Sequence, residues 1–140
     1  MNNDFFSRKN FLITSLLLLV LALVLNPYIL GLCVNEKTFC YFDNLSHPIG
    51  KPLFYLALAL FLTAVASFLF KAEAFTKWVR FGIVLIFVLG LIIFITPEYG
   101  GSGIVSIERD GVAFVLSILY FFVSIIVIAY KSWRLRGKSL

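Results

Sequence analysis

The chain has 140 residues, of which 61% are apolar and only 14% are charged, with a formal net charge of +5. A typical soluble domain has about 25% charged residues, and so short a chain cannot bury this much apolar surface in a core of its own. The composition therefore excludes an ordinary soluble domain and favours a protein embedded in a membrane.

Four long apolar runs follow one another along the chain, and each can cross a hydrocarbon core of about 30 Å as a helix. In lipid every backbone group needs an internal partner, so unbroken apolar runs of this length must be helices. They cover residues 11–32, 52–70, 79–96 and 112–130. We predict an all-α integral membrane fold, a single domain over residues 1–140 with four transmembrane helices in an up-down bundle.

Three residues near the ends of these runs match helix boundaries. Pro52 suits a first turn, where its missing N–H costs nothing. Pro97 fits a stop just after the third helix, and Asp110 can serve as the N-cap of the fourth. The first run lacks a cleavage site of small residues, so we expect a retained span rather than a removed signal peptide.

Lys and Arg lie mainly on one side of the predicted helices. Three occur in the first and third connections, residues 33–51 and 97–111, and the other nine lie in the tails and the second connection. Because cytoplasmic loops carry an excess of Lys and Arg, we predict a protein of the plasma or inner membrane with both termini cytoplasmic. The nine are Arg8, Lys9, Lys71, Lys77, Arg80, Lys131, Arg134, Arg136 and Lys138.

Aromatic and basic residues meet at the cytoplasmic ends of the predicted helices. Trp and Tyr prefer the membrane interface, and bases near acidic headgroups contribute about 1 kcal/mol each. We therefore expect membrane lipid as a partner, and no nucleic acid. The predicted lipid anchors are Lys77, Trp78, Arg80, Trp133, Arg134 and Arg136.

Small and polar residues recur at helical spacing within the spans, as close packing of helices in lipid requires. We predict that they face the bundle interior, with Gly82 and Gly90 as an alternative contact with another subunit. Gly90→Leu is then expected to disrupt the bundle or its oligomer. The predicted packing residues are Ala59, Thr63, Gly82, Gly90, Ser117, Tyr120 and Ser124.

No ionisable residue of the Asp, Glu, Lys, Arg or His type lies well inside any run. Such residues mark proton relays and ion pathways in membranes, so the sequence argues against a pump or an ion-coupled transporter. Tyr120 with Ser117 and Ser124 forms the most polar patch, which we expect to hydrogen-bond across helices, for instance to Thr63. Lining a substrate path is the alternative. The lone histidine, His47, and the absence of catalytic motifs predict no catalytic, cofactor or metal site.

The two outer connections carry the remaining features. Cys33 and Cys40 are the only cysteines, and on an oxidising side we expect a disulfide that closes a small β-hairpin. Residues 104–108 alternate in polarity and can add a third strand. Three acidic residues give the second outer connection an acidic character, which we interpret as that of a solvated loop; a docking patch for an external partner is the alternative. These residues are Glu98, Glu108 and Asp110.

The favoured role is non-enzymatic, an accessory or assembly subunit that acts through helix packing and outer-loop contacts with a partner or a second copy. The alternative is a small channel or facilitator with a polar path near Tyr120. A membrane enzyme that acts on thiols or lipids comes third, because six residues separate the two cysteines and no second pair exists.

Overall fold

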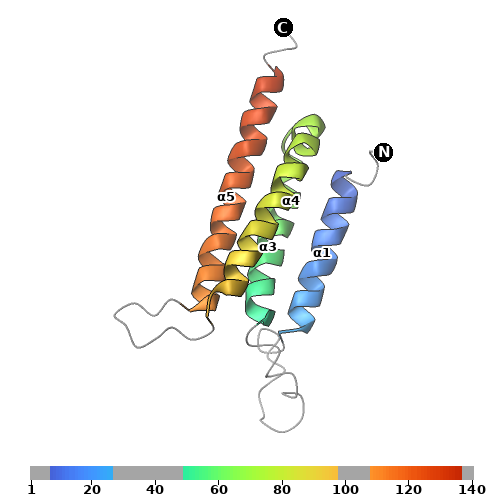
Figure 1. Cartoon of the computed structure of the whole chain (residues 1–140). Helices are drawn as coiled ribbons and strands as arrows, with labels where there is room; N and C mark the ends of the chain where they lie inside the picture. Colours follow the sequence, from blue (N-terminus) through green and yellow to red (C-terminus); the bar gives the residue numbers. More distant parts are fainter. Residues whose placement is uncertain (1–6, 27–48, 98–107, 137–140) are drawn as a thin grey trace.

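The computed structural model describes residues 7–26, 49–97 and 108–136, and these residues form four α-helices and no strand. The helices run alternately in opposite directions, so α1 begins and α5 ends at the same end of the bundle (Figure 1). The predicted all-helical fold with four helices is confirmed for this part of the chain. The helices are α1 (Arg8–Val24), α3 (Lys51–Ser67), α4 (Ala72–Ile95) and α5 (Arg109–Arg136).

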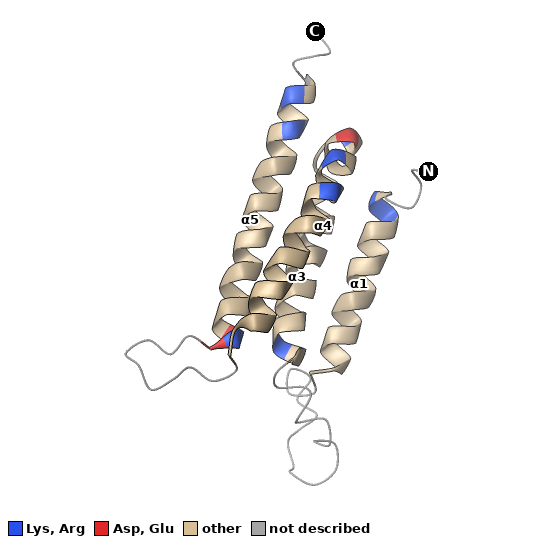
Figure 2. Ribbon diagram, in the orientation of Figure 1, with Lys and Arg blue, Asp and Glu red and all other residues tan. Residues whose placement is uncertain are grey.

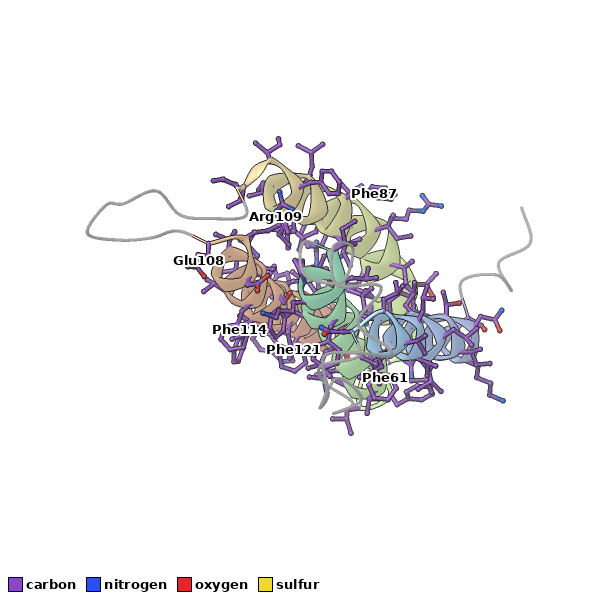
Figure 3. All side chains as sticks on the ribbon, turned by 90° about the horizontal axis from the view of Figure 1, so that it is seen from below. Phe61, Phe87, Glu108, Arg109, Phe114 and Phe121 are labelled. Atoms are coloured by element: carbon purple, nitrogen blue, oxygen red, sulfur yellow. The ribbon has the colours of Figure 1, made fainter. Side chains whose placement is uncertain are left out.

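Helix α3 lies in the middle of the arrangement. It packs extensively against α1 and α5, whereas α4 packs chiefly against α5 and touches α3 little. The view along the bundle shows α4 crossing the others at an angle, from the start of α5 toward α1 (Figure 3). Phe11 of α1 accordingly meets α4 near its start, with ring centroids 5.4 Å from Phe75 and 5.7 Å from Trp78.

Three helices begin or end several residues away from the predicted boundaries, and one of them, α5, runs over Arg109–Arg136 rather than over 112–130. Helix α1 ends at Val24 rather than at residue 32, because Asn26 precedes Pro27 and the residue before a proline is pushed out of the helical conformation. Helix α4 begins at Ala72 rather than at residue 79. The prediction started this helix after its charges, but charged side chains are readily accommodated in a terminal turn that reaches beyond the apolar segment.

The residues expected at helix boundaries are placed as follows. Pro52 lies in the first turn of α3 and Pro97 follows Thr96, the C-cap of α4, both as predicted. Asp110 is not the N-cap of α5, since the helix already begins at Arg109 and Asp110 lies in its first turn. A carboxylate in that turn still interacts favourably with the helix dipole.

Helices α4 and α5 are long and apolar enough to cross a membrane, and only 28% of the most apolar window of each is buried within the structure. Helices α1 and α3 have 17 residues each and are shorter than the predicted spans. Figure 2 shows that the charged residues of the described helices gather at the two ends and leave the middle bare. We call the end where α1 and α4 begin and α5 ends the basic end. Its Lys and Arg residues are Arg8, Lys9, Lys71, Lys77, Arg80, Lys131, Arg134 and Arg136.

Candidate functional site

An aromatic cluster fills the space between α1, α4 and α5 toward the basic end. Trp78 is its centre, 1% exposed, and contacts the rings of Phe11, Phe75 and Tyr120, the last at 6.5 Å between centroids. The sequence analysis expected Trp78 to be a lipid anchor at the membrane surface. The structure instead buries Trp78, because α4 crosses toward α1 and Phe11 of α1 packs against the indole.

Gly82 makes room for that indole. A Cβ atom at Gly82 would lie 2.6 Å from Cζ2 and 2.9 Å from Cε2 of Trp78, closer than real Cβ contacts allow. At Gly90 a Cβ atom would meet nothing within 4 Å. The two glycines therefore do not form one packing stripe, since Gly82 serves the interior and Gly90 lies on an open surface.

The other predicted packing residues are all buried. Ala59 and Thr63 lie on α3, while Ser117, Tyr120 and Ser124 lie on α5. The expected hydrogen bond between Tyr120 and Thr63 is not formed within the described residues. The Thr63 hydroxyl instead donates to the Ala59 carbonyl of its own helix at 2.8 Å.

Several polar atoms in the same interior have no partner. The hydroxyls of Tyr120 and Ser124 lie near one another, yet neither makes a hydrogen bond of good geometry within the described residues. The hydroxyl of Ser117 and the indole N–H of Trp78 are likewise buried and unpartnered there. Each such group costs roughly 1–3 kcal/mol of lost hydration, so these buried atoms are candidates for hydrogen bonds to bound water or to a small polar solute.

Two apolar grooves open on the outside of the bundle. Ser117 also lines the first, an opening of about 230 Å³ between α3 and α5, together with Tyr55 and Phe114, whose rings meet edge to face. The second, about 690 Å³, runs along α4 around Gly90. Its other described lining residues are Ile86, Phe87, Leu91, Phe94 and Ile95.

The basic end is tied together by hydrogen bonds to the turn between α3 and α4. A guanidinium nitrogen of Arg8 donates to the Phe70 carbonyl at 2.6 Å, and the Lys71 amide donates to the Ser132 hydroxyl at 3.4 Å. The turn itself is closed by three backbone hydrogen bonds of residues 68–70. Helices α1 and α5 thus both hold the α3–α4 connection in place.

A cleft of about 450 Å³ lies beside this turn, between the start of α4 and the end of α5. Lys77, Lys131, Arg134 and Leu135 line it, and the Lys131 ammonium donates to the Lys77 carbonyl across it at 3.0 Å. Of the predicted anchors, Lys77 and Arg134 thus converge in one cleft. Arg80 and Trp133 are exposed beside them, and the Arg136 side chain lies outside the described residues.

Two residues of the predicted acidic patch, Glu108 and Asp110, lie at the opposite end of the bundle. The Asp110 carboxylate lies 3.1 Å from the Lys51 ammonium, so this acid is already engaged within the chain. Arg109 donates to the Thr96 carbonyl at 2.9 Å and lies 6.0 Å above the Phe94 ring. Glu108 is exposed, whereas Glu98 falls outside the described residues.

The predicted disulfide between Cys33 and Cys40, the hairpin it would close and the third strand also lie outside the described residues, as does His47. Within residues 7–26, 49–97 and 108–136, no three His, Cys, Asp or Glu side chains come together as metal ligands would.

No protein-family model, curated protein or solved structure matches this chain. The function is therefore argued from the geometry alone.

Sequence reasoning missed two features that need the fold. The aromatic cluster joins Phe11 to Phe75 and Trp78, which are more than 60 residues further along the chain. The basic cleft joins Lys77 to Arg134. The sequence carried only part of the signal for this cleft. Lys131 and Arg134 are three residues apart and therefore share a helix face, but nothing in the sequence places Lys77 opposite them.

Proposed function

We propose that this chain is a multi-pass integral protein of the plasma or inner membrane, and that it acts as a non-enzymatic accessory or assembly subunit. The observation that carries this proposal is the apolar outer surface of the helices. Phe87 and Phe94 of α4 are 73% and 72% exposed, and Figure 3 shows Phe87 pointing away from the other helices. Covering one such side chain contributes about 1.5–3 kcal/mol, so the surface requires lipid or another helix.

The distribution of charge supports an orientation with both termini in the cytoplasm. The basic end has eight Lys and Arg residues against one described acid, Glu73, whereas the opposite end pairs Lys51 and Arg109 with Glu108 and Asp110. An excess of Lys and Arg on one side of the membrane is typical of the cytoplasmic side.

The groove around Gly90 supports a contact with a further helix. A glycine lets two helix backbones approach closely, and in lipid such packing takes the place of hydrophobic attraction between helices. The groove is open and apolar, and Gly90 has space where a Cβ atom would project. We assign it to a helix of a protein partner or of a second copy.

The experiment compares the native mass of the chain after gentle extraction with that of a Gly90→Leu variant. We expect a wild-type protein mass above 15.8 kDa, and a return to the single-chain mass for Gly90→Leu. Gly111→Leu is the matched control, since Gly111 also has open space around it but lies outside the groove. A wild-type protein that is monomeric and without a partner contradicts the subunit role, and release from membranes by alkaline carbonate contradicts the membrane placement.

A second candidate function is a facilitator for a small polar solute. The unpartnered hydroxyls of Ser117, Tyr120 and Ser124 favour it, because they leave hydrogen-bonding groups in the interior for a solute to engage. Vesicles that contain the protein should then take up a small polyol faster than empty vesicles, and Tyr120→Phe should remove the difference. Equal uptake by both kinds of vesicle eliminates this candidate.

A further inference from the structure

The strongest unexplained feature is the basic cleft between α4 and α5. Lys131 and Arg134 lie three residues apart on one face of α5, and Lys77 faces them from α4 across about 450 Å³ of space. Leu135 supplies an apolar wall. Three cationic side chains from two helices therefore converge on one concave site.

The charges of this cleft are not balanced by the protein. In the part of the chain that the structure describes, none of the three cations makes an ion pair with a carboxylate, and the ion pair between Lys51 and Asp110 lies at the other end of the bundle. Glu73, four residues before Lys77, is exposed and does not approach it within salt-bridge distance. Three like charges held together repel one another unless an anion enters between them.

The donors are arranged for an oxyanion. The hydrogen bond from Lys131 to the Lys77 carbonyl fixes one ammonium at the cleft, and an ammonium has two further N–H groups to offer. Arg134 presents a planar guanidinium, whose paired donors match two phosphate oxygens. Lys77, which is exposed, adds a third charge.

We propose that this cleft binds the phosphate of an acidic phospholipid headgroup. The assignment to lipid rather than to free phosphate rests on the membrane placement proposed above and on the neighbouring surface. Phe81, Tyr130 and Trp133 are exposed on the same two helices, within four residues of the residues that line the cleft. Acyl chains can therefore follow the apolar helix faces while the headgroup occupies the cleft. Basic pockets between helices on the cytoplasmic side are the usual sites for acidic headgroups.

The test is lipid retention by the intact chain in detergent, measured by native mass spectrometry with phosphatidylglycerol and with phosphatidylcholine. We expect selective retention of phosphatidylglycerol, weakened about tenfold by Arg134→Gln and again by Lys77→Gln, since each variant removes a charge-assisted hydrogen bond to the phosphate. Arg80→Gln and Lys9→Gln are the matched controls, because both residues are exposed at the same end but do not line the cleft. A thermal melt of each variant confirms that the fold is kept.

Three results overturn the assignment. Equal retention of both lipids shows that the cleft does not select a negative headgroup. An equal loss in Arg80→Gln and Arg134→Gln shows a diffuse charge effect rather than a site. Displacement of lipid by millimolar inorganic phosphate shows that the site serves the free anion. Carbonate extraction of the membranes before they are solubilised separates these failures from failure of the membrane placement.

Discussion

The contact between Gly82 and Trp78 offers the most direct test of the fold. Replacing Gly82 with Ala puts a methyl group 2.6 Å from Cζ2 and 2.9 Å from Cε2 of the indole. The ring cannot simply swing away, because Phe11, Phe75 and Tyr120 surround it. Either the indole leaves its position or α4 moves outward, and both responses disturb the aromatic cluster.

The magnitude follows from a comparison with Gly90→Ala. Both substitutions remove a glycine from the interior of α4, and each gains about 1 kcal/mol of helix propensity. Only Gly82→Ala adds the cost of overpacking, typically about 1–3 kcal/mol, since Gly90 has open space around it. We therefore expect Gly82→Ala to be less stable than Gly90→Ala by about 1–3 kcal/mol.

The assay is equilibrium unfolding of the purified chain in mixed micelles, followed by tryptophan fluorescence in a Trp133→Phe background so that only Trp78 reports. We expect a lower free energy of unfolding and a shifted emission for Gly82→Ala, with Gly90→Ala at or above wild type. When it is combined with Gly82→Ala, Trp78→Phe should relieve part of the loss, because the smaller ring leaves space for the methyl group; this pair of variants keeps Trp133 and is followed by circular dichroism. Equal stability of the two alanine variants would refute the packing described for Trp78.

Two further predictions concern single polar groups. Arg8→Ala should lower the free energy of unfolding by about 1.5–3 kcal/mol, because it removes the charged hydrogen bond to the Phe70 carbonyl. Lys9→Ala changes an exposed neighbour and should alter the free energy of unfolding little. Equal effects of the two variants in denaturant titrations would contradict the role of Arg8. Tyr120→Phe should leave stability unchanged or raise it by about 1 kcal/mol, because it removes an unpartnered buried hydroxyl, and a clear loss in the same titration would instead reveal a bound water or solute.

Local signals predicted much of the fold. Apolar runs set the number of helices, and Pro52 and Pro97 marked a start and a stop where the structure has them. The predicted helix ends that were wrong are those where a second effect outweighed the hydrophobicity of the segment. Ala72 begins α4 because its first turns tolerate charge, and α1 ends before the proline that lies inside the apolar run.

The candidate sites were harder to predict because they depend on rotation and on contacts between distant segments. Gly82 and Gly90 are eight residues apart, which at 3.6 residues per turn places them about 80° apart around α4. One can therefore face Trp78 while the other faces outward. Tryptophan is a residue type that is enriched at membrane interfaces. Only the fold, in which α4 crosses toward α1, explains why Trp78 is buried instead.

The limited contact between α3 and α4 has a consequence for the order of assembly. These helices are joined by the short turn 68–71, yet each packs far more extensively against α5, which follows both in the chain. During synthesis α3 can already pack against α1, whereas α4 leaves the ribosome before its main packing partner exists. We expect α4 to stay loosely associated, and open to chaperones or insertion factors, until α5 arrives and packs against both α3 and α4.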